Sequence, residues 1–282
     1  MKRILPILLA LGAVTASTGR TETNDVAFSA ACDGTEQRYV LMLPAGYKPG
    51  QPHDLLMALH GHGSDRWQFA RDKRDECRAA RDVAAAHNMI YVSPDYRAKT
   101  SWMGPKAEAD VVQIIGDLKR RHHIRHVFIC GGSMGGTSAL TLAALHSDLV
   151  DGVAAMNGTA NHVEYANFQD AIAASFGGSK TDVPDEYRKR SAELNSPRLT
   201  MPVGLTVGGK DSVVPPQSVL RLAGVAKAVG RPILLLHRES RGHSTDYDDA
   251  KAILEFVIRE AGNTLNSDST SGLKGKAPEV PI

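Results

Sequence analysis

The sequence predicts an α/β protein with a doubly wound, mostly parallel sheet. Short apolar runs typical of strands alternate with longer amphipathic stretches typical of helices through most of the 282 residues. Such alternation indicates parallel strands with helices on both faces of the sheet. The composition, with 42% hydrophobic and 23% charged residues, is typical of a globular protein, and the length suffices for one large domain with a buried core.

Strand and helix segments follow one another in chain order from residue 37. Pro44 and Gly46 end the first strand, and Val111, Ile114 and Leu118 recur at helical spacing in the second helix. The expected strands are 37–43, 54–59, 89–92, 126–130, 152–156, 203–207 and 233–237. The expected helices are 71–87, 107–122, 137–145, 216–229 and 248–261.

Two segments depart from this alternation. Residues 157–197 are polar and rich in small residues, with short helix candidates at 168–176 and 184–194. Because ligands bind outside the carboxyl ends of the strands in open α/β sheets, we expect this insertion to form a small cap over the site. The last stretch, 263–282, is rich in Ser, Gly, Lys and Pro, which predicts a disordered tail.

The amino terminus has the three regions of a secretory signal. Lys2 and Arg3 precede an apolar run, and small residues follow it, with Val14 and Ala16 at positions suited to cleavage. We therefore expect a signal peptide at residues 1–16 and a secreted or periplasmic mature chain. The apolar run is short for a bilayer span, so no stable membrane insertion is expected. A net charge of +2 gives no reason to expect a nucleic acid partner.

The sequence Gly-Gly-Ser-Met-Gly at 131–135 lies between an expected strand and an expected helix. Gly-x-Ser-x-Gly in this position is typical of a nucleophile elbow, a tight turn that lifts a serine hydroxyl clear of the backbone. Ser133 is therefore the candidate nucleophile. A phosphate-binding turn is the alternative, but the lysine of a P-loop is missing and the spacing of a dinucleotide fingerprint is not present.

A serine nucleophile needs an imidazole to accept its proton and a carboxylate to orient that imidazole. After an elbow the acid is expected next along the chain and the histidine last. Asp211 follows the expected strand 203–207, and His243 follows the strand after it. Asp211 could instead cap the helix near Pro216. Asp95 also follows a strand, but it precedes the serine.

The oxyanion of the tetrahedral intermediate needs hydrogen-bond donors. We expect one to be the backbone N–H of Met134, directly after the nucleophile, and the other to be that of His62 in a glycine-rich loop, with Gly63 as second choice. His60 and His62 could suggest a metal pair, but no third ligand is near them in the sequence. We therefore expect neither a metal nor a cofactor.

Two further residues are candidates for substrate binding. Trp102 follows an early strand, where its ring could stack on a sugar or aromatic group, although packing beneath the cap would also explain it. Asn157 follows the strand 152–156 and is the weaker candidate.

The cysteines leave one question open. Cys32 and Cys77 could pair in an oxidising compartment, but sequence does not establish the geometry that a disulfide needs. Cys130 reads as a buried small apolar residue.

These motifs together resemble those of the α/β-hydrolase superfamily. Within it the chain is similar to secreted esterases of the feruloyl/acetylxylan esterase and polyhydroxybutyrate depolymerase type, and to the catalytic domains of prolyl oligopeptidases. The resemblance implies ester hydrolysis through an acyl-enzyme on Ser133, without a cofactor. It extends over residues 38–261 and is carried by the motifs at 59–63, 131–136, 208–215 and 242–243.

The sequence thus predicts an exported serine hydrolase whose catalytic domain spans residues 17–262. We expect it to cleave carboxylic esters of small molecules or of plant or microbial polysaccharides. Two alternatives stay open at this point: a serine peptidase of the prolyl oligopeptidase type, and a noncatalytic scaffold of the same fold that binds a carbohydrate or a partner.

Overall fold

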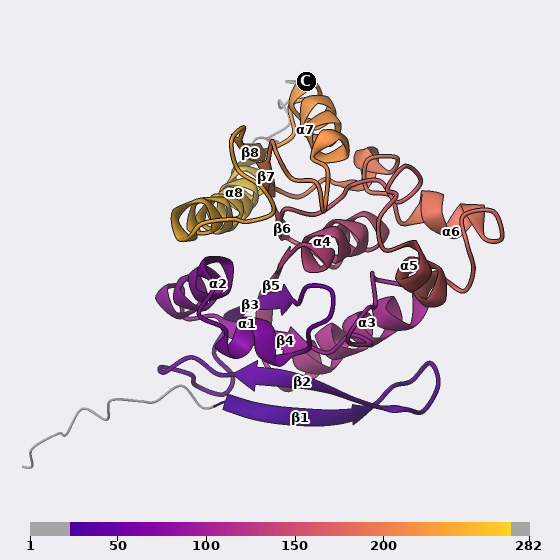
Figure 1. The fold of residues 1–282 in the computed structure, drawn as a ribbon. Helices are drawn as coiled ribbons and strands as arrows, with labels where there is room; N and C mark the ends of the chain where they lie inside the picture. The colour runs from indigo at the N-terminus through magenta and orange to yellow at the C-terminus, as the bar shows by residue number, and fades with distance from the viewer. Residues whose placement is uncertain (1–22, 272–282) are drawn as a thin grey trace, which may run out of the picture.

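An eight-stranded sheet forms the centre of the structure, a computed structural model that describes residues 23–271 and their side chains to residue 263 (Figure 1). The strand order is β1-β2-β4-β3-β5-β6-β7-β8. β1 and β2 are antiparallel to each other, β2 is antiparallel to β4, and all other neighbours are parallel, which confirms the predicted doubly wound, mostly parallel sheet. The strands are β1 (Thr23–Ser29), β2 (Glu36–Met42), β3 (His53–Leu59), β4 (Ile90–Pro94), β5 (Ile124–Gly132), β6 (Gly152–Met156), β7 (Val203–Gly208) and β8 (Ile233–Arg238).

Side chains of the central strands alternate between two apolar layers. Leu55, Met57 and Leu59 of β3 pack into one layer, and Leu56 and Ala58 pack into the other. Successive side chains of a strand point to opposite faces of the sheet, so a strand covered on both faces contributes to both layers. Both layers are free of solvent at these positions, so the sheet is a rigid platform for the loops at its ends.

Helices cover both faces of the sheet (Figure 1). The first layer contains α3 (Pro105–Arg121), α4 (Met134–Leu145) and α7 (Gln217–Ala228). The second contains α1 (Trp67–Arg71), α2 (Asp75–Ala86) and α8 (Tyr247–Ser271).

The structure differs from the expected elements in three places. β1 was not predicted, because an edge strand with alternating exposed and half-buried residues has a weak apolar signal. The helix expected at 71–87 is divided: Asp72 accepts a hydrogen bond from the N–H of Arg74 at 3.0 Å, and the chain turns before α2 begins. α8 continues to Ser271, so the first residues of the segment expected to be disordered are helical.

The segment expected to form a cap contains two short helices and a 3-10 turn: α5 (Gln169–Phe176), α6 (Pro184–Lys189) and η1 (Ser196–Arg198). An aromatic cluster joins it to the rest of the domain. The ring of Trp102, which is fully buried, lies 5.6 Å from that of Tyr165 and 5.5 Å from that of Phe168. This segment therefore packs on the domain through its own core rather than lying loosely over it.

The predicted signal peptide, residues 1–16, and residues 272–282 lie outside the described residues. Between residues 23 and 271 no helix combines the length and the apolar character needed to cross a membrane.

Cys32 is exposed, Cys77 is buried, and both are free thiols, so the structure does not pair them. Burial raises the pKa of Cys77 to about 12.

The first prediction concerns the packing of α4 on the sheet. Gly135→Ala would place a methyl group against the carbonyl of Leu59, with the carbonyl carbon only 2.7 Å away. Because backbone is less able to yield than a side chain, we expect the free energy of unfolding to fall by about 2 kcal/mol or more, measured by urea denaturation. Gly224→Ala on the exposed face of α7 is the matched control, since its methyl group meets open space. It should be neutral or stabilising by up to about 1 kcal/mol. Equal effects of the two changes would contradict this view of the packing.

The second prediction concerns His162, which is fully buried beside Trp102 and Phe176. Neither ring nitrogen has a partner among the described residues, and burial, aided by the charges of Arg190 and Lys180, lowers its pKa to about 3. The unfolded chain therefore binds one proton more than the folded chain between about pH 3 and 6.5, and stability falls as the pH falls through this window. We expect this group alone to cost about 2 kcal/mol at pH 5.

His162→Phe removes this titration and keeps the ring shape. The variant should lose less stability than the parent between pH 7.5 and pH 5, as measured by thermal unfolding at both values. An identical loss in the two proteins would show that His162 does not carry the effect.

Candidate active site

Ser133 occupies the one-residue turn between β5 and α4. Its backbone has φ +58° and ψ −122°, a region that residues other than glycine rarely adopt. The N–H of Ser133 donates to the carbonyl of Met156 on β6 at 2.8 Å, and its carbonyl accepts from the N–H of Thr137 at 3.0 Å. The backbone on both sides of the serine is thus held, and the strain is maintained by the surrounding structure.

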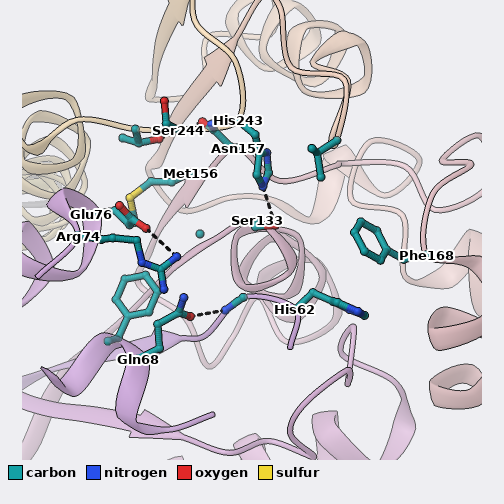
Figure 2. A pocket seen from close by; sticks show the side chains of 15 residues that line it. His62, Gln68, Arg74, Glu76, Ser133, Met156, Asn157, Phe168, His243 and Ser244 are labelled. Carbon is teal, nitrogen blue, oxygen red and sulfur yellow. Dashed lines mark hydrogen bonds and ion pairs between the residues drawn. The ribbon is translucent and has the colours of Figure 1, made fainter. Parts of the chain in front are cut away.

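Ser133, His243 and Asp211 form a continuous hydrogen-bonded chain (Figure 2 shows the first two). Ser133 Oγ lies 2.9 Å from His243 Nε2, and His243 Nδ1 lies 2.6 Å from Asp211 Oδ2. The structure therefore brings together the three side chains that the sequence singled out, although 110 residues separate the serine from the histidine. The imidazole is partly exposed, with 25% of its side chain accessible, whereas only 1% of the aspartate side chain is.

Backbone groups hold Asp211 in place. Its Oδ1 accepts hydrogen bonds from the N–H groups of Val213 and Val214 at 2.9 and 2.8 Å, which leaves Oδ2 for the histidine. These donors precede α7, which begins at Gln217, so the carboxylate does not cap that helix. A buried carboxylate is tolerated when its oxygens are satisfied in this way.

The loop that carries His243 is anchored to the sheet by a hydroxyl and amide network. Thr245 Oγ1 donates to Asn157 Oδ1 at 2.9 Å and lies 2.7 Å from Thr206 Oγ1 on β7. The N–H of Asn157 donates to the carbonyl of Thr206 at 2.9 Å. The Nδ2 of Asn157 is buried without a partner among residues 23–271. Asn157 thus lies in the wall of the cavity, but its recorded side-chain contacts are with the histidine loop and β7; substrate binding by this residue stays a prediction.

The predicted oxyanion donors are two backbone N–H groups. That of Met134 begins α4, and that of His62 lies in the loop after β3. On either side of His62 the N–H groups are engaged: Gly61 donates to Gln68 Oε1 at 2.6 Å and Gly63 to the carbonyl of Lys99 at 2.8 Å. Gly63 is therefore not available as the second-choice donor, and His62 stays the candidate.

The expectation that Trp102 lines the pocket is wrong. Its ring is fully buried, and its Nε1–H donates to His62 Nδ1 at 3.2 Å. Phe168 and Phe69 line the cavity instead, and the ring of Phe168 lies 4.4 Å from that of His62. Trp102 thus packs beneath the segment that contains Phe168, which was the other interpretation of this residue.

The imidazoles of His60 and His62 do not converge. His60 is buried, and its ring nitrogens lie 2.9 Å from the carbonyl of Gly61 and 3.0 Å from that of Asp95. Burial lowers the pKa of His60. The Asp95 carboxylate pairs with Arg66 at 2.9 Å and takes no part in the chain at Ser133.

Ser133 lies in a cavity of about 290 Å³ with two unlike walls (Figure 2). The apolar wall, Phe168 and Val213, contains two of the exposed large hydrophobic side chains of the described structure. The other side of the serine in Figure 2 is mixed, because the polar side chains of Gln68, Arg74 and Glu76 lie there with that of Met156, and Phe69 also lines the cavity. Sequence reasoning missed these wall residues, and the only available signal was the dense run of charges at residues 71–76.

The geometry supports acyl transfer. A nucleophile, a base in contact with it, an orienting carboxylate and two candidate oxyanion donors meet at one edge of the sheet. Their positions follow from the parallel strands, because the loops after β5, β7 and β8 emerge at the same edge.

Comparison with known proteins agrees with this fold. The model of the prolyl oligopeptidase family matches residues 78–264. Feruloyl esterase C of Emericella nidulans is 27% identical over 165 residues, which are 55% of this chain and 60% of that protein, so the chain spans less than two thirds of this relative. The acylaminoacyl peptidase of Pyrococcus horikoshii superposes with a TM-score of 0.66 at 17% identity, over 86% of this chain and 42% of that chain. A fluorophosphonate-binding serine hydrolase of Staphylococcus aureus superposes with a TM-score of 0.64 at 17% identity, over 85% and 99%.

The resemblance to the α/β-hydrolase superfamily is confirmed, and the fold and the family match agree that the chain is a hydrolase of this type. The family model covers more than half of the sequence, including Ser133, Asp211 and His243. The chain belongs to the prolyl oligopeptidase family of serine hydrolases.

Proposed function

We propose that this protein is an exported serine esterase that hydrolyses carboxylic esters, with Ser133 as nucleophile, His243 as general base and acid, and Asp211 as the group that orients His243. The observation that carries the proposal is the hydrogen-bonded chain of 2.9 and 2.6 Å that links the three side chains. Both distances are short enough for direct proton transfer and orientation in the resting enzyme.

Acylation begins when Ser133 Oγ attacks the ester carbonyl carbon. Its proton passes to His243 Nε2, and the imidazolium that forms is stabilised by the Asp211 carboxylate at Nδ1. The carbonyl oxygen becomes an oxyanion, which accepts hydrogen bonds from the N–H groups of His62 and Met134. Met134 lies at the N-terminus of a twelve-residue helix, whose dipole favours this negative charge.

The intermediate collapses when the bond between the acyl carbon and the alcohol oxygen breaks. His243 gives its proton to the leaving oxygen, and the acyl group stays on Ser133. Water then attacks the acyl-enzyme with His243 again as base, and the acid and the free serine are released. This sequence requires no metal and no cofactor.

The ester assignment draws on similarity to a feruloyl esterase. Export to the periplasm or the medium draws on the signal-like residues 1–16. The partners proposed are small-molecule or polysaccharide esters, with neither nucleic acid nor stable membrane insertion.

A second candidate is a serine peptidase. The family match and the likeness to an acylaminoacyl peptidase favour it, and the same side chains would cleave an amide by the same steps.

The nucleophile is tested by Ser133→Ala. We expect hydrolysis of p-nitrophenyl acetate to fall by about 10⁴-fold or more, because the attacking oxygen is removed, while thermal unfolding stays near that of the parent. Labelling by a fluorophosphonate probe should also disappear. Retention of activity and labelling would reject Ser133 as nucleophile.

His243→Gln has a matched control on the preceding strand. His237→Gln changes an exposed histidine near the end of β8 and should leave the rate within about twofold, since surface changes usually have small effects. His243→Gln should lower the rate by about 10⁴-fold or more. Equal effects of the two changes would show that His243 has no special part in the reaction.

The bond is tested by matched acyl groups. We expect kcat/KM for p-nitrophenyl or methyl esters to exceed that for the corresponding p-nitroanilides and for aminoacyl or prolyl amides, with every rate removed by Ser133→Ala. A preference for amides would establish the peptidase instead.

A further inference from the structure

We propose that the loop after β4, residues 95–103, holds the loop after β3, residues 60–63, in the geometry that acyl transfer needs, and that Trp102 is a positioning residue in this arrangement. Trp102 acts through the side chain of His62, whose backbone N–H is the predicted oxyanion donor. The inference rests on the proposed serine hydrolase chemistry, and it holds for ester and amide substrates alike.

Three hydrogen bonds join the two loops. They run from the Tyr96 hydroxyl to the His60 carbonyl at 2.5 Å, from the Trp102 indole N–H to His62 Nδ1 at 3.2 Å, and from the Gly63 N–H to the Lys99 carbonyl at 2.8 Å. Gly61, the remaining residue of the loop after β3, is held by Gln68. The N–H of His62 has no recorded acceptor among residues 23–271, so it is available to an oxyanion while the backbone around it is fixed.

The loop after β3 needs this support because of its glycines. Gly61 and Gly63 flank His62, and Gly63 has φ +80°. Glycine has more conformational freedom than other residues, so contacts from outside must fix a loop of this kind. Between the two glycines, the imidazole of His62 is the side chain through which the surrounding structure can hold the loop.

The indole of Trp102 is a fixed partner for this imidazole. Its ring is fully buried, 5.6 Å from that of Tyr165 and 6.4 Å from that of His162, so packing restricts its motion. The indole N–H can only donate, so His62 Nδ1 accepts and the neutral ring carries its proton on Nε2. Burial lowers the pKa of His62, which favours this neutral form. The imidazole is therefore held in one tautomer and one orientation.

The loop after β4 is itself held in a strained conformation. Positive φ values, which residues other than glycine rarely adopt, occur at Tyr96 (+31°), Arg97 (+69°), Trp102 (+44°) and Met103 (+56°). Strained backbone persists only where the surrounding structure maintains it, and it is found most often at functional sites. Here Arg97 pairs with Asp110 of α3 at 2.5 Å, and the Met103 carbonyl accepts from the buried Arg190 at 2.7 Å. The loop is thus a rigid support.

Loss of this support would affect the chemical steps. The oxyanion exists only in the tetrahedral intermediates that lead to and from the acyl-enzyme. A misplaced donor therefore slows both acylation and deacylation, and it leaves binding of the ground state little changed. The expected signature is a fall in kcat with a nearly constant KM.

Trp102→Phe tests the contact, because it keeps an aromatic ring and removes the N–H. We expect kcat for p-nitrophenyl acetate to fall by about 10-fold, since a displacement on the order of 1 Å costs up to about 100-fold, while KM changes by less than about twofold. In a His62→Phe background the same substitution should lower kcat by less than about twofold further, because the acceptor is already missing. An equal loss in the two backgrounds would show that Trp102 acts by packing alone.

A second pair of variants tests the two loops independently of the indole. Tyr96→Phe removes the hydroxyl that holds the His60 carbonyl, and it should lower kcat by about 3- to 10-fold. The matched control is Tyr187→Phe, which removes a hydroxyl bonded to the Gly178 carbonyl at 3.2 Å, outside both loops. Both tyrosines are 1% exposed, and the control should change kcat by less than about twofold.

Thermal unfolding establishes that each variant is folded, and the two tyrosine variants decide the matter if Trp102→Phe is not. Unchanged kcat in the folded Trp102 and Tyr96 variants, a rise in KM alone, or an equal loss in the Tyr187 control would overturn the inference and leave the hydrolase intact. Failure of the parent to hydrolyse both esters and anilides, or activity that survives Ser133→Ala, would instead count against the proposed function.

Discussion

The close approach of α4 to β3 is the constraint on which the site depends. Gly135 leaves no room for a side chain above the carbonyl of Leu59, so the helix begins immediately after β5. The chain must therefore turn within one residue, and Ser133 takes a positive φ at a cost on the order of 1–3 kcal/mol. The Met156 carbonyl and the apolar body of α4 hold it there. The position of the nucleophile is thus a consequence of backbone packing.

The parallel sheet supplies the remaining geometry. β7 and β8 run parallel to β5, so the loops that follow them carry Asp211 and His243 to the edge where Ser133 lies. Burying the carboxylate of Asp211 would be costly if its oxygens were unpaired. Two backbone N–H groups and the histidine satisfy them, and Thr245 fixes the histidine loop to the sheet. The carboxylate is therefore rigid before any substrate arrives, as electrostatic preorganisation requires.

The order of elements could be predicted because each catalytic candidate follows a strongly apolar strand. The sequence itself shows the order of the Gly-x-Ser-x-Gly motif, Asp211 and His243. Because the strands before them are parallel, the residues that follow these strands lie close together at one edge of the sheet. The position of the Trp102 side chain could not be predicted in this way. A tryptophan after a strand has the same local pattern whether it lines a pocket or packs beneath a distant segment. Its burial is due to Tyr165 and Phe168, which come from more than sixty residues further along the chain.

The wall residues were hidden for a related reason. Asp75 and Glu76 are adjacent acidic residues at the start of a helix, where acidic side chains favour the dipole and are usually solvated. The sequence does not tell these two residues apart. In the fold their surroundings differ, because Asp75 pairs with Arg78 whereas Glu76 packs beside Gly132. The edge strand β1 escaped prediction because its pairing with β2 comes from backbone hydrogen bonds and needs little apolar side-chain surface.

Membership in the prolyl oligopeptidase family does not by itself determine which bond is cleaved, because acyl transfer on a serine serves esters and amides alike. The residues that line the cavity must make that selection. An extended peptide needs partners for its backbone N–H and C=O groups on both sides of the reacting carbonyl. Here Phe168 and Val213 form one side of the cavity and offer no side-chain hydrogen bonds. A peptide backbone laid across Ser133 would bury polar groups against the apolar wall, at a cost of about 1–3 kcal/mol for each unpaired group. An ester has no N–H group to leave unpaired at this wall, which is one reason to propose an esterase before a peptidase.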